Sequence, residues 1–249
     1  MAETPALSLI VPLKDEASNV VAVVEEVAMV LRPAVPDYEL ILVDDGSTDA
    51  TFEHVRRLHA ADPGHLVALR FARNFGQSAA FSAGFAAARA PLVATMDGDL
   101  QNDPADLPKL MRLAASHDIV CGWRKNRQDA VLTRHVPSVI ANWLIGLATG
   151  VHLHDNGCSL KVFRAEVVKP LHLRAGMHRY LPAIASQVGG RVTEVVVNHR
   201  PRRFGQSKYG LSRTFKVVAD LMHLRRVMRE ALVPPSPDAP LYEIAERLE

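Results

Sequence analysis

The chain has 249 residues, of which 48% are hydrophobic and 22% charged, and its formal net charge is +2. This composition is typical of a globular protein, which excludes extended disorder, and the small net charge argues against a strongly basic nucleic-acid-binding protein. The two cysteines, Cys121 and Cys158, provide neither a disulfide framework nor a metal cluster, so a reducing cytosol is expected. The sequence shows no evident signal peptide and no apolar stretch long enough to span a membrane.

Apolar runs alternate with helical patterns along the first half of the chain. Runs rich in Val, Ile and Leu predict parallel strands that are covered on both faces, over residues 7–13, 39–45, 65–71, 91–97 and 118–123. Helical spacing between these runs predicts helices over residues 19–31 (capped by Ser18), from Thr48 or Asp49 to Ala61, 77–89 and 104–116. This alternation predicts an α/β fold with a mostly parallel open sheet flanked by helices.

Two amphipathic segments follow in the second half. Val136–Val151 and Phe215–Leu232 each carry an apolar helical face, which either packs on the sheet or lies on a membrane surface. The second segment is the better membrane candidate because it is basic, with Arg225, Arg226 and Arg229. Residues 233–249 are predicted to form a tail that consists of a linker and a short helix, Leu241–Leu248.

Polar residues follow each predicted strand, at the edge of the sheet where ligands bind in open α/β folds. These loops are residues 12–16, 44–49, 73–77, 97–101 and 124–127. No Gly-rich dinucleotide fingerprint and no phosphate-binding P-loop motif occurs in the chain, so neither a nicotinamide-binding nor a P-loop fold is supported.

Acidic residues are concentrated after the second and fourth predicted strands. Asp97 and Asp99 would point to the same side of an extended chain, and two close carboxylates favour Mg²⁺ or Mn²⁺, which takes its remaining ligands from water and a diphosphate. Asp44 and Asp45 are candidates for accepting hydrogen bonds from a base and a ribose, whereas residues 46–49 have the pattern of a turn and helix cap. Asp103 and Asp106, which flank Pro104, are start signals for the next helix.

Five motifs together resemble the family 2 glycosyltransferases, in the branch of dolichyl-phosphate mannose synthase and the bacterial polyprenyl-phosphate sugar transferases. They are LSLIVPLKDEASNV, LILVDDGSTD, RFARNFGQSAAFSAGF, MDGDLQNDP and RPRRFGQSKYG, in order from about Leu7 to Leu221. The resemblance implies the GT-A type fold, a nucleotide-diphospho-sugar-binding α/β domain. It also implies one catalytic domain over residues 1–232, with a nucleotide-sugar half (about 1–125) and an acceptor half (about 126–232), followed by the tail 233–249.

The resemblance also assigns site residues. It places Pro12, Glu16, Asp44 and Asp45 around the nucleoside, while Asp97, Gly98 and Asp99 handle ribose, diphosphate and metal, and Gln101 completes the metal site. Lys14 and Asp15 stand where the family usually has Tyr and Asn, so Lys14 is a candidate contact to the base or a phosphate. The acceptor phosphate and donor diphosphate would be bound by Arg124, Arg134, Arg202, Ser207 and Lys208. Asp99, Arg124, Arg202 and Lys208 are the residues expected to act in catalysis.

A phosphate acceptor is already ionised and needs no general base, so this resemblance implies an inverting, metal-dependent single displacement from GDP-mannose or a UDP-sugar to dolichyl or undecaprenyl phosphate. Two alternatives stay open. A soluble glycosyltransferase acting on a hydroxyl would need a base, for which Asp155 is the candidate, although a turn is the simpler interpretation of Asp155-Asn156-Gly157. The second alternative is a non-catalytic nucleotide-sugar-binding subunit.

A lipid acceptor also implies a location. Related bacterial enzymes often continue into transmembrane helices, so we expect peripheral attachment to the cytoplasmic face of the membrane, or a separate membrane partner protein, and no nucleic acid.

Overall fold

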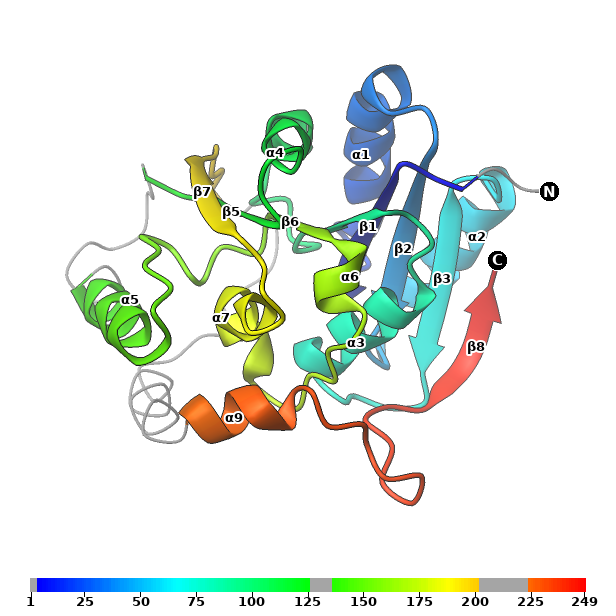
Figure 1. The fold of residues 1–249 in the computed structure, drawn as a ribbon. Coiled ribbons are helices and arrows are strands. Elements are labelled where there is room, and N and C mark those ends of the chain that lie inside the picture. The colour runs from blue at the N-terminus through cyan, green and yellow to red at the C-terminus, as the bar shows by residue number, and fades with distance from the viewer. Residues whose placement is uncertain (1–3, 126–135, 202–223) are drawn as a thin grey trace.

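The computed structural model describes residues 4–125, 136–201 and 224–249. Its centre is one eight-stranded sheet with the strand order β7-β5-β6-β4-β1-β2-β3-β8. The strands are β1 (Leu7–Leu13), β2 (Tyr38–Asp44), β3 (Leu66–Phe71), β4 (Leu92–Thr95), β5 (Ile119–Trp123), β6 (Lys161–Arg164), β7 (Val192–Val196) and β8 (Ile244–Leu248). The sheet runs through the middle of the molecule, with helices on both sides (Figure 1).

The strand directions bring the predicted polar loops to one edge of the sheet. Strand β1 is parallel to β2 and β4, and β2 is parallel to β3. Strand β6 is antiparallel to both β4 and β5, so β5 runs in the same direction as β4. The carboxyl ends of β1 to β5 therefore lie at the same edge, which we call the rim.

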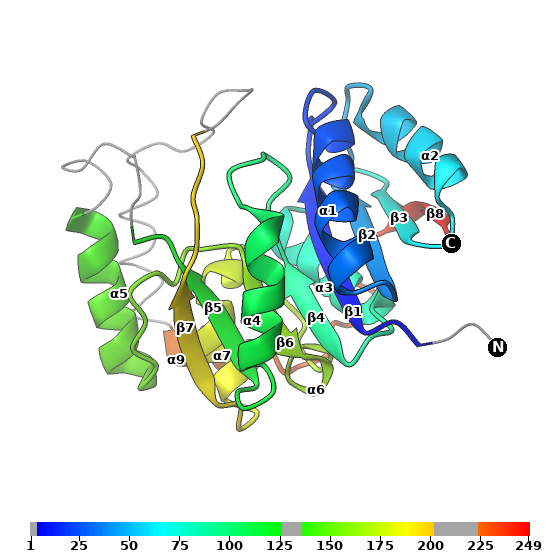
Figure 2. The same cartoon turned by 90° about the horizontal axis from the view of Figure 1, so that it is seen from above.

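Helices cover both faces of the sheet. The α-helices are α1 (Val20–Ala34), α2 (Thr51–Ala61), α3 (Gln77–Ala87), α4 (Leu107–Leu113), α5 (Val136–Thr149), α6 (Ala165–Val168), α7 (Leu181–Ser186) and α9 (Leu224–Glu230), and the 3₁₀ helices are η1 (Pro104–Asp106) and η3 (Met177–Tyr180). One buried hydrophobic cluster joins the sheet to α1, α2 and α4, and a second joins it to α3, α6, α7 and parts of α5 and α9. The view from above shows α5 beyond the β7 end of the sheet (Figure 2).

Helix α1 shows why the sequence pattern predicted these elements well. Its apolar residues at helical spacing, among them Val20, Val27 and Leu31, are all buried against the sheet. The predicted cap was wrong, because Asn19 rather than Ser18 precedes the helix and no side chain caps it. Helix α2 begins at Thr51, later than predicted, and α3 ends at Ala87 rather than at residue 89.

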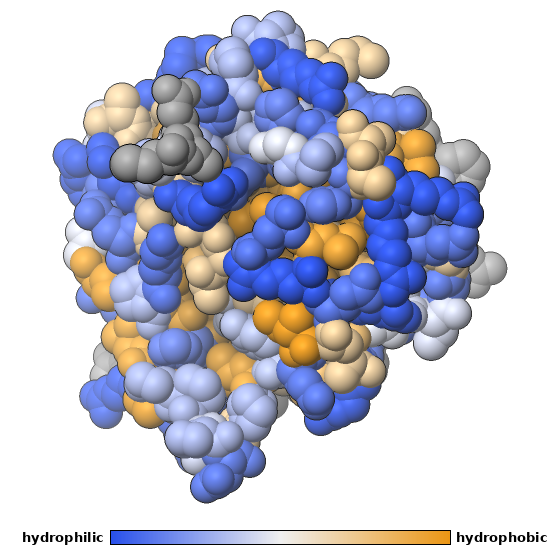
Figure 3. All heavy atoms as spheres, turned by 90° about the vertical axis from the view of Figure 1, so that its right-hand side faces the viewer, coloured by the Kyte–Doolittle hydropathy of each residue, from blue (hydrophilic) through white to orange (hydrophobic). Residues whose placement is uncertain are grey.

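Three strands were not predicted, and the sheet is therefore mixed. Strands β6 and β7 lie in the second half of the chain, where β6 inserts antiparallel between β4 and β5. The short helix predicted for residues 241–248 was wrong, because Ile244–Leu248 forms β8, which pairs antiparallel with β3. Arg56 forms an ion pair with Glu246 and fastens this strand to α2. Hydrophilic side chains predominate on the face seen from the β8 side, with smaller hydrophobic areas between them (Figure 3).

The predicted C-terminal amphipathic helix over residues 215–232 is described only from residue 224 onward. Residues 224–230 form α9, whose Met228 is buried in the core together with the following Ala231, while Arg226 and Arg229 are exposed. The remainder of the predicted helix lies outside the described residues. In the part of the chain that the structure describes, no helix has the length and apolar character needed to cross a membrane.

Candidate active site

The loops that follow β1 and β2 are fastened to each other at the rim. The backbone N–H of Asp15 donates to Ser47 Oγ (2.9 Å), and the carboxylate of Asp15 accepts from the N–H of Thr48 (2.8 Å). Lys14 donates its ammonium to the carbonyl of Gly46 (2.8 Å). Lys14 therefore lies beside the acidic loop after β2, where the sequence placed the nucleoside, and Glu16 accepts a hydrogen bond from Asn19.

Asp44 and Asp45 are both buried and have protein partners. Asp44 accepts from the N–H of Ser47, and Asp45 accepts from the backbone N–H groups of Phe75 (2.6 Å) and Gly76 (2.9 Å). Burial raises the pKa of both carboxyl groups, and these hydrogen bonds partly offset the increase. Asp45 thus holds the two residues that precede α3 and joins the loops after β2 and β3.

Gly46 is required by this close approach of the two loops. Its φ is +63°, and a Cβ at this position would lie 2.5 Å from the carbonyl carbon of Arg73. Only glycine fits such a backbone without strain or displacement. The turn that the sequence predicted is therefore also a packing contact between the loops after β2 and β3.

The Asp97 to Gln101 loop begins just beyond β4. Asp97 accepts a hydrogen bond from the side-chain amide of Gln77, the first residue of α3 (Nε2 to Oδ1, 2.8 Å). Asp99 accepts from the backbone N–H of Gln101 (3.2 Å). Both residues lie beyond the last residue of β4, so the strand alternation that the sequence suggested does not set the direction of their side chains; Leu100 in the same loop has a φ of +63°. A Cβ on Gly98 would lie 2.7 Å from the side chain of Leu13, so the loop packs directly on β1.

Asp103 and Asp106 connect this loop to the segment after β7. Asp103 caps η1 as predicted, by accepting from the N–H of Ala105 (3.1 Å), but it also forms an ion pair with Arg200 (2.8 Å). Asp106 accepts from the N–H of Asn198 (2.7 Å). Their function is therefore wider than starting a helix, because they hold residues 198–200 against the loop that contains Asp99 and Gln101.

Arg124 follows β5 and forms a two-pronged pair with Asp155. Its Nε lies 2.7 Å from Asp155 Oδ2, its Nη2 lies 2.9 Å from Oδ1, and both side chains are largely buried. Burial alone would lower the pKa of Arg124, but the hydrogen bonds and charge of Asp155 outweigh it, and Asp97 adds to the increase. A positively charged guanidinium is thus held at the rim within the electrostatic reach of Asp97.

The donor atoms at the rim fit a divalent cation of the magnesium type. Asp97 and Asp99 offer carboxylate oxygens and Gln101 an amide oxygen, the ligands that Mg²⁺ and Mn²⁺ accept when a substrate diphosphate supplies further oxygens. Within residues 4–125, 136–201 and 224–249, no group of three or more His, Cys, Asp or Glu side chains is placed to hold a metal ion. A two-carboxylate site of this kind does not require such a group.

Some predicted residues cannot be placed, and one neighbour was missed. Arg134, Arg202, Ser207 and Lys208 lie outside the described residues. Gln77 was not predicted as a site residue, although it opens a helix directly after a rim loop, and that position was the available signal. Its contact with Asp97 joins residues 20 positions apart in the chain.

Comparison with known proteins identifies sequence relatives. The model of the family described as "Glycosyl transferase family 2" matches residues 8–171. The chain is 47% identical over 227 residues to the dodecaprenyl-phosphate galacturonate synthase of Rhizobium johnstonii, covering 90% of this chain and 67% of that protein. It is 35% identical to the undecaprenyl-phosphate 4-deoxy-4-formamido-L-arabinose transferase of Aeromonas hydrophila, covering 87% of this chain and 66% of that protein. The chain thus spans about two thirds of the length of these relatives.

Solved structures share the fold at low sequence identity. A mannosyltransferase from Pyrobaculum calidifontis, in complex with GDP-Man and Mn²⁺, aligns with a TM-score of 0.64 at 19% identity and covers 95% of this chain and 67% of that one. Mannosyl-3-phosphoglycerate synthase from Rubrobacter xylanophilus aligns with a TM-score of 0.68 at 15% identity, over 98% of this chain and 87% of that one. The GT-A type fold expected from the sequence is therefore confirmed.

Proposed function

Because the chain belongs to glycosyl transferase family 2, we propose that it transfers a sugar from a nucleotide-diphospho-sugar to a polyprenyl phosphate, with inversion at the anomeric carbon. The named activities of the relatives from Rhizobium johnstonii and Aeromonas hydrophila, both polyprenyl-phosphate sugar transferases, support this proposal. They carry different sugars, so the donor sugar is left open and UDP-galacturonate enters the test beside GDP-mannose and other UDP-sugars.

The observation that carries the proposal is the buried guanidinium of Arg124 at the same rim as Asp97 and Asp99. A cation held by the carboxylate pair would attract the donor diphosphate, and a fixed arginine at the same rim is suited to a phosphate monoester. A binding group for each of the two phosphate-bearing substrates would then lie at one edge of the sheet.

The proposed reaction is one displacement. An oxygen of the acceptor phosphate attacks the anomeric carbon from the side opposite the diphosphate, the new C–O bond forms as the bond to the diphosphate oxygen breaks, and the nucleoside diphosphate leaves with both electrons. The phosphate is already ionised near neutral pH, so the protein needs to supply only position and charge stabilisation. Arg124 would orient the acceptor phosphate, and the predicted Arg202, Ser207 and Lys208 would assist outside the described residues.

Asp97, Asp99 and Gln101 are proposed to hold Mg²⁺ or Mn²⁺ when it is bound, and the ion would supply positive charge to the departing diphosphate. Gln77 fixes one oxygen of Asp97 through its amide. Around the nucleoside, Pro12, Lys14 and Glu16 are proposed contacts on the side of β1. Asp44 and Asp45 are proposed contacts on the side of β2 through the lone pairs that their backbone partners leave.

The contacts of Asp155 disfavour the alternative in which the acceptor is a hydroxyl. That reaction needs Asp155 as a general base, but two hydrogen bonds from Arg124 stabilise its charged form and so weaken it as a base. A carboxylate in this position is better suited to hold an arginine than to take a proton.

A polyprenyl phosphate lies in a bilayer, so we propose peripheral contact with the cytoplasmic face of the membrane through α5. Trp143 and Leu147, one helical turn apart on α5, have exposed fractions of 60% and 61%. An aromatic and an aliphatic side chain on one exposed helical face are suited to a membrane interface. The alternative proposal is that a separate membrane partner protein holds the chain at the membrane.

The function is tested by incubating the purified protein with radiolabelled nucleotide sugars, Mn²⁺ or Mg²⁺, and either a short polyprenyl phosphate or the matching polyprenol. The proposal predicts organic-extractable label with the phosphate only, and loss of the metal-dependent reaction in Asp99→Ala. Transfer to the polyprenol, transfer only to water-soluble acceptors, or full activity of Asp99→Ala would contradict it.

A further inference from the structure

The fork between Arg124 and Asp155 leaves one edge of the guanidinium for another anion. Asp155 occupies the edge formed by Nε and Nη2, and its Oδ2 also accepts from the backbone N–H of Arg124 (3.3 Å). These bonds fix both the plane and the position of the guanidinium. The opposite edge, formed by Nη1 and the second N–H of Nη2, makes no hydrogen bond to any described residue and can donate to two oxygens of a phosphate.

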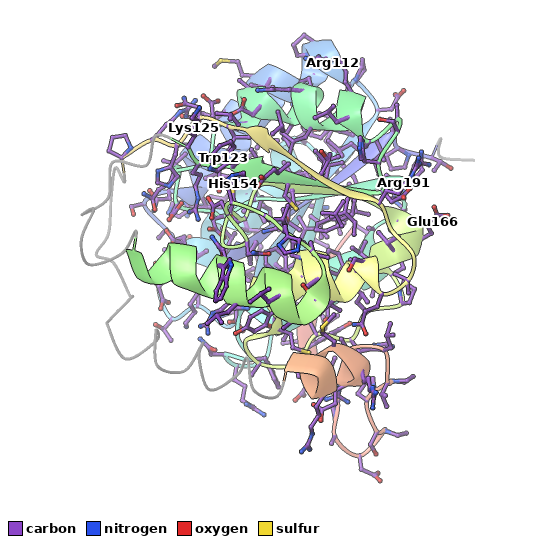
Figure 4. The ribbon with its side chains drawn as sticks, turned by 60° about the vertical axis from the view of Figure 1, so that its left-hand side comes forward. Arg112, Trp123, Lys125, His154, Glu166 and Arg191 are labelled. Atoms are coloured by element: carbon purple, nitrogen blue, oxygen red, sulfur yellow. The ribbon has the colours of Figure 1, made fainter. Side chains whose placement is uncertain are left out.

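The turn that carries Asp155 is itself held from two sides. On the side of α5, Asn142 donates to the carbonyl of His154 (2.6 Å) and accepts from the amide of Asn156 (3.3 Å). On the side of β7, Glu194 accepts from the N–H of His154 (2.9 Å) and contacts its imidazole. The ring of His154 stacks on Trp123 with 4.1 Å between ring centroids. Figure 4 shows the two rings together beside Lys125, which lies next to Trp123.

Two consecutive residues, at and just after the end of β5, therefore contact two consecutive residues of the turn that contains Asp155. Trp123 stacks on His154, and the next residue in each segment, Arg124 and Asp155, forms the buried ion pair. Asn142 and Glu194 contact His154 and Asn156, the residues on either side of Asp155, and make no hydrogen bond to the guanidinium of Arg124 in the described residues. Such an arrangement restricts the side chain of Asp155 to the orientation in which it grips Arg124.

We propose that Asp155 is a positioning residue, which holds Arg124 so that the outer edge of its guanidinium receives the phosphate of the acceptor, and that Asn142 and Glu194 support it. This inference rests on the proposed function. In this proposal Asp155 takes no proton in the reaction, because both of its oxygens accept hydrogen bonds from Arg124. Its proposed effect on acceptor binding is exerted through Arg124.

A double-mutant cycle tests this dependence, with Arg124→Gln, Asp155→Asn and the double variant assayed for transfer to polyprenyl phosphate. We expect Asp155→Asn to raise the KM for the acceptor about tenfold or more with little change in the KM for the donor, and to have less than about a twofold effect once Arg124 is already glutamine. We also expect kcat of Asp155→Asn to fall at low pH as it does in the wild type (the acidic limb of the pH profile), because the acceptor phosphate and not Asp155 must be ionised. An equal rise of the acceptor KM in both backgrounds would overturn the inference, and disappearance of the acidic limb of the pH profile would favour a base instead.

A single substitution in a buried ion pair can prevent folding, so thermal melting and nucleoside diphosphate binding are measured for every variant. Glu194→Gln and Asn142→Ala keep both members of the pair and give the same comparison, with a raised acceptor KM and an unchanged donor KM. If both variants have the wild-type acceptor KM, the proposed support of Asp155 is overturned.

Asp118→Asn is the matched control. Asp118 precedes β5, at the end of the sheet opposite the rim, and pairs with Arg164 (3.2 Å) and Arg191 (3.4 Å). Arg191 lies well away from Trp123 and His154 in Figure 4. The control is expected to leave the acceptor KM unchanged. If the wild-type chain transfers no sugar to polyprenyl phosphate, the proposed function fails and this inference with it; if it transfers sugar and the cycle is additive, only this inference fails.

Discussion

Substitution of Gln77 by leucine removes one hydrogen bond from the carboxylate proposed to hold the metal. The side-chain amide of Gln77 lies 2.8 Å from Oδ1 of Asp97. A hydrogen bond to a charged group contributes about 1.5–3 kcal/mol, and the lower end applies here because Asp97 is only half-buried. About 1.5 kcal/mol corresponds to roughly a tenfold change in an equilibrium constant. We therefore expect Gln77→Leu to weaken Mn²⁺-dependent binding of the nucleoside diphosphate about tenfold.

Calorimetric titration with UDP and GDP, with and without Mn²⁺, measures this effect directly. The loss is expected in the presence of Mn²⁺ and not in its absence, because Gln77 acts on Asp97 rather than on the base. Gln187→Leu, an exposed glutamine at the end of α7, is the control and should bind as the wild type does. Unchanged or tighter binding by Gln77→Leu, or an equal loss in the control, would show that Gln77 does not support the metal site through Asp97.

Three further predictions concern stability and membrane contact. Gly46→Ala places a Cβ against the backbone of Arg73 at a φ of +63°, so it should lower the free energy of unfolding by about 1–3 kcal/mol; an unchanged denaturant midpoint would contradict this. Asp103 has a lowered pKa because, although burial alone would raise it, hydrogen bonds from Asn198, Ala105 and Arg200 outweigh that effect. Its stabilisation is present above the unfolded-state pKa of 3.8 and is lost as the pH falls through the lower folded-state value, so Asp103→Asn should reduce Tm at pH ~6 and progressively less below pH 3.8; a constant difference in Tm would count against this. The double substitution of Trp143 and Leu147 by serine should weaken binding to vesicles about tenfold without affecting nucleoside diphosphate binding, and equal vesicle binding would exclude α5 as the membrane contact.

The sequence predicted the strands of the first half because β1 to β4 are buried on both faces and therefore read as continuous apolar runs. Strands β6 and β7 carry Lys161 and Glu194 and have no such run, so they were missed. Residues 244–248 have a helix-compatible composition, and only pairing with β3 makes them a strand. Partners that are distant in sequence decided these elements, and local propensity cannot reveal them.

The candidate site shows the same division. The acidic loops after β2 and β4 could be predicted at one rim, because parallel strands place their carboxyl ends together. The contacts of Asp45 with the loop before α3, of Gln77 with Asp97 and of Asp155 with Arg124 join residues 20 to 31 positions apart. Nothing in the local pattern distinguishes a carboxylate that binds substrate from one that binds a neighbouring loop.

The central claim is that a phosphate of a lipid, rather than a hydroxyl, attacks the donor sugar. Phosphorus and proton NMR of one reaction with polyprenyl phosphate, Mn²⁺ and the accepted nucleotide sugar tests it most directly. We expect the phosphomonoester signal to be replaced by that of a sugar phosphodiester, with the anomeric configuration inverted relative to the donor. A phosphomonoester that persists while the donor is consumed, or a product with retained configuration, would contradict it.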